Sequence, residues 1–171
     1  MYTEGNKKNF KEMKAVNEAV EAYVESIDSR HNFFNREERM NLSHFLDDKM
    51  LLIFAIRQGI SYSLFNSIQG ITPFTEEEWA EYLNISTKSL QRYRKAPNHV
   101  FKPALSEKII ELLEVVHLGS QVFDTTDQFY GWLHSSSMAL GGQRPAELIK
   151  DSYGKEMVIE ELNRIEHGIF A

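Results

Sequence analysis

The sequence predicts an all-α protein. Its 171 residues include only four prolines and nine glycines, so few positions interrupt regular structure. Apolar residues recur at intervals of three and four, whereas the strict alternation of half-buried strands is scarce. With 42% hydrophobic and 12% aromatic residues, the chain has enough apolar surface to bury a core.

The first predicted helix runs from about Asn9 to Ser29. Its apolar stripe has spacings of three and four, at Met13, Val16, Val20, Tyr23 and Ile27. This stripe is too short for a coiled coil to be assigned from it, so we favour an amphipathic helix that packs on its own domain, with a dimer seam as the alternative. A second helix is predicted from about Arg36.

The next segments carry clear helix boundaries. A helix through "KMLLIFAIRQG" is predicted to stop at Gly59, and a short helix in "SYSLFNSIQ" is predicted to end at Gly70 and Pro73. Thr75 is followed three residues later by Glu78, the spacing of a capping box. The helix it opens, "EEEWAEYL", is expected to bury Trp79, Tyr82 and Leu83.

A tight turn follows at "NIS". Asn84 can adopt the left-handed conformation that such a turn requires. Ser86 is placed to cap a second helix, from Thr87 to about Lys95, which Pro97 closes. Two short helices joined by a tight turn form a helix-turn-helix, whose second helix enters the major groove of DNA.

The second helix coincides with a local excess of positive charge. Residues 1–48 carry −3, residues 49–86 carry −2, residues 87–102 carry +5 and residues 103–171 carry −6, which sums to the net charge of −6. An acidic protein binds DNA only if its cations are focused on one face and the acidic remainder points away. The separation along this chain is compatible with that arrangement.

The predicted helix sorts its side chains by face. At about 100° per residue, Leu90 and Tyr93 point inward together. Arg, Lys and Gln can bond base edges or phosphates, and hydroxyls at a helix start can hold a phosphate oxygen. The candidate DNA-binding residues are therefore Ser86, Thr87, Lys88, Ser89, Gln91, Arg92 and Lys95. The alternative is a solvated charged helix in an ordinary α-helical core, and charge alone leaves both open.

The last third of the chain is predicted to form a core helix and a small helical module. From Pro103 to about Val122 the chain is apolar on more than one face, which indicates a buried helix. A helix capped by Thr125 or Thr126, a loop with positive φ at Gly141 and Gly142, and a short helix opened by Pro145 follow. Gly154 is expected to stop that segment, and a final helix is expected to end near His167, with Gly168 behind it.

The stretch from Val122 to the end resembles the C-terminal toxin-binding domain of the Xre/MbcA/ParS antitoxins. The resemblance rests on "VF", "WL", "ALGGQRP" with Leu148, Gly154, and the closing "V...L.RIEHGIFA", in this order. Upstream, "FAIRQGISYSLFNSIQ" and "LNISTKSLQRYRK" resemble the Xre-type helix-turn-helix of that family. The resemblance spans about residues 54–171, whereas residues 1–50 match nothing we can place.

The resemblance implies a type II antitoxin. Such a protein binds a RES-domain toxin that consumes NAD, covers the toxin's active site, and represses the shared operon through its DNA-binding module. In the family the C-terminal end lies at the toxin's catalytic pocket. Carried over by position, the candidate toxin-binding residues are Arg144, Glu166, His167, Gly168, Ile169, Phe170 and Ala171. Packing of Ile169 and Phe170 on the domain's own core is the alternative.

We therefore expect a helix-turn-helix module joined through a core helix to a small helical C-terminal domain. The predicted division is residues 1–50 as an N-terminal helical region of unknown role, 51–102 as the DNA-binding module, and 103–171 as the core helix and toxin-binding domain. A homodimer is expected because helix-turn-helix DNA-binding proteins usually bind paired half-sites. The runner-up is a helix-turn-helix transcriptional regulator with a C-terminal protein-interaction domain and no toxin partner.

Other functional classes find little support in the sequence. The chain has no cysteine, and its six histidines show no metal-ligand spacing such as HExxH. Phosphate-binding glycine loops are absent, so we expect no cofactor and no enzymatic activity. No apolar run approaches the roughly 18 residues of a membrane span, and the N-terminus does not resemble a secretory signal. We expect a soluble cytoplasmic protein without a membrane partner.

Overall fold

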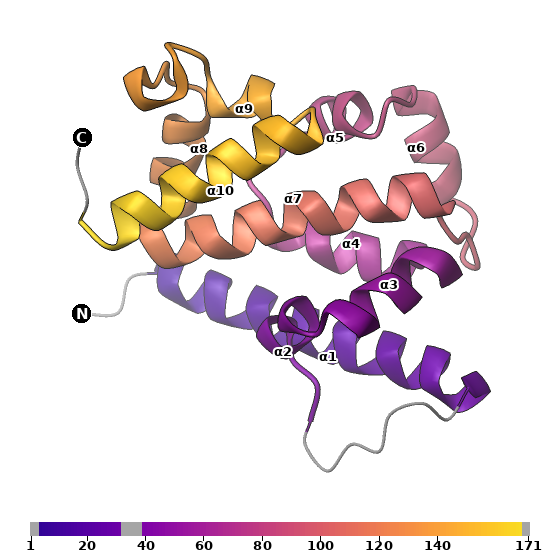
Figure 1. The fold of residues 1–171 in the computed structure, drawn as a ribbon. Coiled ribbons are helices and arrows are strands. Elements are labelled where there is room, and N and C mark those ends of the chain that lie inside the picture. The colour runs from indigo at the N-terminus through magenta and orange to yellow at the C-terminus, as the bar shows by residue number, and fades with distance from the viewer. Residues whose placement is uncertain (1–3, 32–38, 169–171) are drawn as a thin grey trace. The chain divides into compact units, whose positions relative to one another are not determined.

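The computed structural model describes the backbone of residues 4–31 and 39–168, and the side chains of residues 12–28 and 39–168. The described chain is all-α, as the sequence predicts (Figure 1). The helices are α1 (Glu4–His31), α2 (Leu42–Asp47), α3 (Lys49–Gln58), α4 (Tyr62–Ile71), α5 (Glu76–Tyr82), α6 (Thr87–Arg94), α7 (Pro103–Val122), α8 (Thr126–Leu133), α9 (Pro145–Leu148) and α10 (Ser152–Glu166), with a short 3-10 helix, η1 (Met138–Leu140).

The chain packs as two compact units. Unit 1 consists of residues 1–71 and 88–107, and unit 2 consists of residues 72–87 and 108–171. The chain passes between the units at three places, the last of which lies inside the continuous helix α7.

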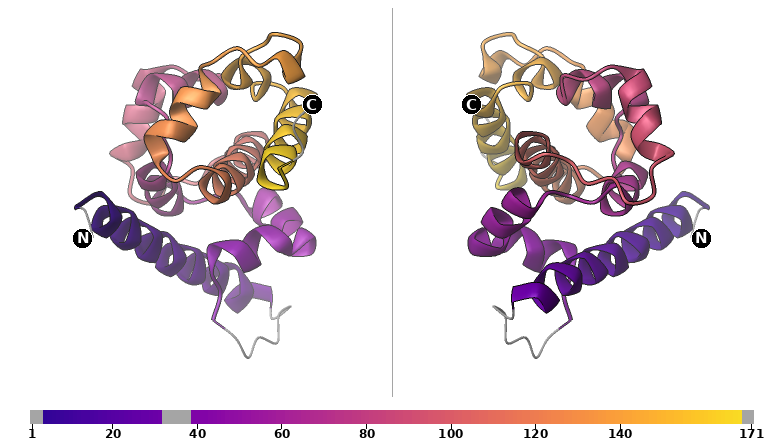
Figure 2. Two further views of the ribbon diagram at one scale, coloured as in Figure 1. Left: turned by 90° about the vertical axis from the view of Figure 1, so that its left-hand side faces the viewer. Right: turned by 90° about the vertical axis from the view of Figure 1, so that its right-hand side faces the viewer.

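In unit 1, the long helix α1 packs against α4 and α2, as the indigo and purple ribbons show (Figures 1 and 2). The predicted apolar stripe of α1 faces inward: Val16 and Val20 are fully buried. The Tyr23 hydroxyl donates to the backbone oxygens of Ala55 and Gly59, at 3.2 Å and 2.9 Å. The stripe thus packs within its own unit, which is the first of the two interpretations considered above.

A short bridge in unit 1 joins the start of α4 to the loop after α6. Ser61 pairs with Val100 in antiparallel register, and the Phe101 amide donates to the Ile60 carbonyl at 2.8 Å. Gly59 sits at this junction with φ of 89°, and a Cβ there would lie 2.3 Å from the Phe101 oxygen. Gly59 therefore ends α3, as predicted, and also allows the close approach of the loop.

The same junction contains a fully buried hydroxyl. Ser106 is 0% exposed. Its oxygen accepts from the Ile60 amide at 2.8 Å and donates to the Phe101 carbonyl at 3.1 Å. A buried hydroxyl is tolerated when its donor and acceptor capacities are both used, so Ser106 fixes the first turn of α7 to the bridge.

In unit 2, the C-terminal part of α7 supplies the buried surface. The predicted core residues are buried, namely Ile109, Ile110, Leu112, Leu113, Val115 and Val116. Three short elements follow this helix segment along the chain, namely α8, η1 and α9, and α8 contacts α9. The closing helix α10 contacts η1 and α9 and is drawn in yellow (Figure 2).

Three predicted boundaries are wrong. The first helix, expected from about Asn9, already begins at Glu4. The helix expected from about Arg36 begins only at Leu42, where Asn41 caps it by accepting the His44 amide; residues 32–38 lie outside the described part of the chain. Gly154, predicted to be a stop, lies inside α10. A Cβ at this position would lie 2.1 Å from the Leu148 carbonyl oxygen, so the glycine is needed for close packing rather than for a turn.

Among the described residues, no helix combines the length and apolarity needed to cross a bilayer.

Candidate functional site

The turn between α5 and α6 has the predicted local geometry. Thr75 and Glu78 form a complete capping box at the start of α5. Asn84 adopts a left-handed φ of 52°, and the Ile85 amide donates back to the Ala80 carbonyl at 3.0 Å. Because this reversal takes only residues 83–86, α6 follows α5 after a tight turn, as a helix-turn-helix requires.

Helix α6 presents its cations to solvent. Leu90 is fully buried and Tyr93 is half-buried, as their predicted inward positions require. The outward face is exposed and consists of Lys88, Gln91, Arg92 and Lys95, and the three hydroxyl residues at the helix start are exposed or half-buried. These exposed groups are of the types that hydrogen-bond phosphates or base edges, and their contact with DNA stays a prediction.

An aromatic stack in unit 1 packs on the inward side of α6, through Tyr93. The rings of Tyr93 and His99 are 3.7 Å apart at an interplanar angle of 10°, and Phe101 meets both edge-on. The Arg92 guanidinium lies 5.5 Å from the centre of the Tyr93 ring, within the range of a cation–π contact. Burial, together with the nearby Arg92 charge, lowers the pKa of His99.

Arg94 is separate from the outward face. Its Nε donates to the Tyr62 hydroxyl at 3.4 Å, a long bond that directs the guanidinium toward α4 of the same unit. Of the basic residues on α6, Lys88 and Arg92 therefore remain the strongest candidates for DNA contacts.

In unit 2, polar contacts fix α5 to the C-terminal part of the chain. Glu78 uses one carboxylate oxygen for the capping box, and the other lies 2.9 Å from Nε2 of His134 and 3.3 Å from the Tyr130 hydroxyl. Lys150 donates to Glu81 at 2.6 Å and to Glu147 at 2.7 Å. The Glu78 carboxylate and burial both raise the pKa of Tyr130, burial being the larger cause.

These contacts were not foreseen in the sequence. The sequence identifies Glu78 only as the acidic member of a capping box, and no local pattern links it to His134, 56 positions further along the chain. The pairing arises from tertiary packing, because α5 and α8 are neighbours within unit 2. The first helix of the helix-turn-helix therefore packs with the C-terminal part of the chain.

An aromatic cluster holds α8 in place. Thr125 caps this helix by accepting the Gln128 amide, which decides between the two predicted capping residues. Phe129 lies 5.7 Å from Phe123 and 6.2 Å from Trp132, measured between ring centres. Gly119 of α7 leaves room for Phe129, since a Cβ there would lie 2.3 Å from its ring.

The loop between α8 and α9 forms a small closed turn. Ser137 pairs with Gln143, and the intervening glycines, Gly141 and Gly142, have the predicted positive φ values of 67° and 77°. Arg144 follows this turn and precedes Pro145, the first residue of α9. Its side chain is exposed to solvent.

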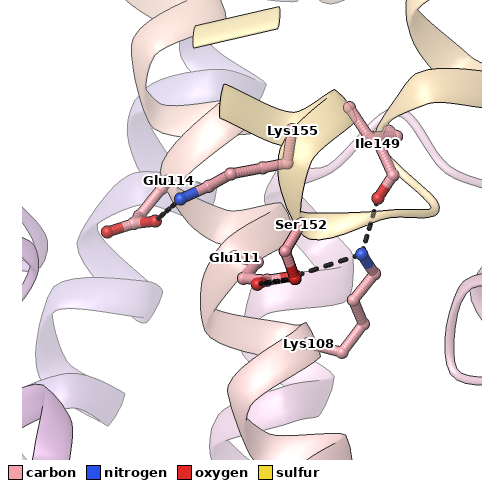
Figure 3. A network of polar contacts seen from close by, with 6 residues as sticks. All are labelled: Lys108, Glu111, Glu114, Ile149, Ser152 and Lys155. Atoms are coloured by element: carbon pink, nitrogen blue, oxygen red, sulfur yellow. Dashed lines mark hydrogen bonds and ion pairs between the residues drawn. The ribbon is translucent and has the colours of Figure 1, made fainter. Parts of the chain in front are cut away.

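Helix α10 is fixed to α7 by a polar network (Figure 3). Lys155 donates to Glu114, and the Ser152 hydroxyl donates to Glu111 at 3.0 Å. Lys108 donates both to Glu111 and to the Ile149 carbonyl, at 3.1 Å and 2.6 Å. Partly buried ion pairs with additional hydrogen bonds restrict rotation of a helix, so this network determines which side of α10 faces outward.

The predicted tail begins where α10 ends. Glu166 closes the helix, Nδ1 of His167 donates to the Asn163 carbonyl at 2.7 Å, and Gly168 turns the chain with φ of 66°. All three residues are exposed. The remaining residues of the predicted tail, Ile169, Phe170 and Ala171, lie outside the described part of the chain.

Two family models match the chain. Residues 118–168 match the "Antitoxin Xre/MbcA/ParS C-terminal toxin-binding domain", and residues 51–114 match the "Antitoxin Xre-like helix-turn-helix domain". The chain belongs to the Xre/MbcA/ParS antitoxin family. It is thus an antitoxin of a toxin–antitoxin system, with a helix-turn-helix domain and a toxin-binding domain.

Two individual proteins are similar to this chain. A curated relative named "Antitoxin Xre", from Yersinia enterocolitica serotype O:8 / biotype 1B, is 25% identical over 122 residues, which cover 71% of this antitoxin and 82% of the relative. A solved structure titled as the M. tuberculosis MbcT–MbcA toxin–antitoxin complex contains a chain that is 24% identical, with a TM-score of 0.49; the match covers 61% of this antitoxin and 94% of that chain.

Within the described residues of this antitoxin, no group of three or more His, Cys, Asp or Glu side chains has a metal-binding arrangement.

Proposed function

We propose that this antitoxin binds a RES-domain toxin that consumes NAD and blocks its active site. The main support is the match of residues 118–168 to a toxin-binding domain, because this match runs to Gly168, where α10 gives way to the tail. Arg144 and the segment Glu166–Ala171 are the proposed inhibitory contacts. A non-enzymatic mode of action accords with this role, since blocking a catalytic pocket needs only steric and electrostatic complementarity.

We further propose that α6 binds operator DNA and represses the operon that encodes both proteins. The exposed face with Lys88, Gln91, Arg92 and Lys95 supports this proposal, as does the match of residues 51–114 to a helix-turn-helix domain. A homodimer would place two such faces on the paired half-sites of an operator. Operator DNA and the NAD pool both point to the cytoplasm as the place of action.

The proposed functional division follows the chain. Residues 51–102 would read DNA, residues 103–171 would form the core helix and hold the toxin, and the role of residues 1–50 is not assigned. Packing groups the chain differently, because residues 72–87 belong to the same unit as the toxin-binding domain.

Co-expression tests the proposed function. The RES-type reading frame expected beside this gene would be expressed from one inducible promoter and the antitoxin from another. We expect the toxin alone to arrest growth and the antitoxin to restore it. Arrest that persists despite soluble antitoxin would contradict the proposal and favour a transcriptional regulator without a toxin partner, as would the absence of a RES-type frame beside the gene.

A further inference from the structure

Helix α10 buries one side and exposes another. Gly154, Val158 and Leu162 are buried at intervals of four residues. By contrast, Tyr153 is 84% exposed and Met157 is 44% exposed, one turn apart on a different side of the helix. Large apolar side chains are thus displayed on a helix whose own core contacts are complete.

These two residues begin a continuous line along the helix. Further residues follow at intervals of three and four, and at 100° per residue all of them fall within an arc of about 80°. We name this line the docking stripe and define it as Tyr153, Met157, Glu160, Arg164 and His167. It is about 21 Å long at 1.5 Å per residue. Its last member, His167, already belongs to the proposed inhibitory segment Glu166–Ala171, so the residues that the stripe adds are Tyr153, Met157, Glu160 and Arg164.

The orientation of the stripe is fixed by the opposite side of the helix. Lys155 and Ser152 are bonded to Glu114 and Glu111 of α7, as Figure 3 shows. Gly154 packs so closely on the Leu148 carbonyl that a Cβ there would lie 2.1 Å from its oxygen, so this side of α10 faces the core. The docking stripe is therefore presented outward in a defined geometry.

The composition of the stripe suits a protein partner. Tyr, Met and Arg are enriched in protein–protein interfaces. A tyrosine contributes a large, rigid contact area at a low entropic cost, and methionine adapts to an irregular surface. Single exposed apolar residues are common and carry little information. Here, however, two of them share one side of a helix that belongs to a toxin-binding domain and leads into the proposed inhibitory tail.

We propose that the docking stripe is a toxin-contact surface in addition to Arg144 and the tail. The complementary toxin surface would have an apolar hollow for Tyr153 and Met157 and a cation opposite Glu160. Arg164 already pairs with Glu161 of the same helix at 3.2 Å, so it would contribute mainly its half-exposed side-chain stem. Binding along the stripe would hold the tail at high effective concentration near the toxin's active site. The inference rests on the proposed function, since it takes the RES-domain protein as the partner.

The test is a binding measurement with full-length antitoxin and the RES-domain protein encoded beside it. Affinity would be compared for wild type, the double variant Tyr153→Ala/Met157→Ala, and the control Asn163→Ala, which removes an exposed side chain from another side of α10. We expect Kd to rise by roughly tenfold or more for the double variant, because buried anchor residues dominate interface energies. The control should bind like wild type.

The outcomes separate the inference from the proposed function. If wild type binds and the double variant binds within about twofold of it, the stripe is not a contact surface, whereas the antitoxin role stands. If wild type does not bind the RES-domain protein, the proposed function is wrong and the inference falls with it. Should the double variant melt at a lower temperature, Glu160→Lys replaces it, because this exposed charge reversal leaves the apolar contacts intact and should also weaken binding.

Discussion

Ser106 shows how one buried hydroxyl joins the first turn of α7 to the bridge in unit 1. Replacing it with alanine leaves the buried Ile60 amide and Phe101 carbonyl without their partner. We expect Ser106→Ala to lower the free energy of unfolding by about 1 to 3 kcal/mol, the cost of burying unsatisfied polar groups. Ser120→Ala is the matched control on α7, because its hydroxyl bond to the His117 carbonyl is exposed to solvent. Urea denaturation of both variants would show whether only the substitution at the buried site lowers the free energy of unfolding.

Two helical glycines differ in the space around them. A methyl group at Gly154 would meet the Leu148 carbonyl oxygen at 2.1 Å, whereas at Gly131 of α8 nothing lies within 4 Å. Gly154→Ala should destabilise the protein by about 1 to 3 kcal/mol through overpacking. Gly131→Ala should stabilise it by about 0.5 to 1 kcal/mol, since alanine favours the helix. Equal effects of the two substitutions on the thermal midpoint would refute this account of Gly154.

His99 gives stability a local pH dependence. Burial and the neighbouring Arg92 lower its pKa in the folded state below the ordinary 6.5, so the unfolded chain binds the proton more readily. Neutral His99 therefore contributes to the free energy of unfolding above pH 6.5, and this contribution is lost as the pH falls toward the folded-state pKa. Between pH 7.5 and 5.5, wild type should therefore lose more unfolding free energy than His99→Gln. Parallel pH profiles for the two proteins would contradict this prediction.

At the scale of elements, α6 is the part whose function is most directly testable. Lys88→Ala/Arg92→Ala should weaken operator binding and reduce the slope of log affinity against log salt by about two, because each phosphate contact contributes roughly 0.9. The matched control is Lys14→Ala, which removes an exposed cation from α1. Fluorescence anisotropy at several salt concentrations measures both quantities. An unchanged slope in the double variant would make α6 a structural helix.

The same elements show what could be predicted from sequence. The bounds of α7 follow from Pro103 and a long apolar pattern, and the α5–α6 turn follows from a capping box and Asn84. Both depend on local chemistry. Gly154 was misassigned because a glycine can mark either a helix stop or a close approach, and only the Leu148 carbonyl distinguishes the two.

The candidate site was also predictable only in part, because sequence patterns report local chemistry and not contacts between distant residues. The exposed face of α6 follows from helical periodicity, which is local. The attachment of α5 through Glu78 and His134 depends on residues far apart in the sequence, and so does the docking stripe, whose orientation is set by the bonds of Lys155 and Ser152 to α7. Single-sequence patterns do not encode such pairings.

For the whole molecule, the packing of the chain brings the two proposed activities together. The first helix of the helix-turn-helix and the toxin-binding domain belong to unit 2, whereas most of α6 belongs to unit 1. The part of the chain that would contact the toxin therefore shares a packed unit with half of the DNA-binding motif. The toxin contact itself needs only the C-terminal end of this antitoxin, which we propose stops NAD consumption by a RES-domain toxin.

The most direct test is the rate of NAD consumption by the purified RES-domain protein while antitoxin is added. Full-length antitoxin should stop consumption when the two are present in stoichiometric amounts. A truncated antitoxin ending at His167 should fail to do so while it still binds operator DNA, because it retains α6 and lacks only Gly168 to Ala171. NAD consumption that continues unchanged at an excess of full-length antitoxin would contradict the proposed inhibition. Full inhibition by the truncated protein would show that Gly168 to Ala171 are not inhibitory contacts.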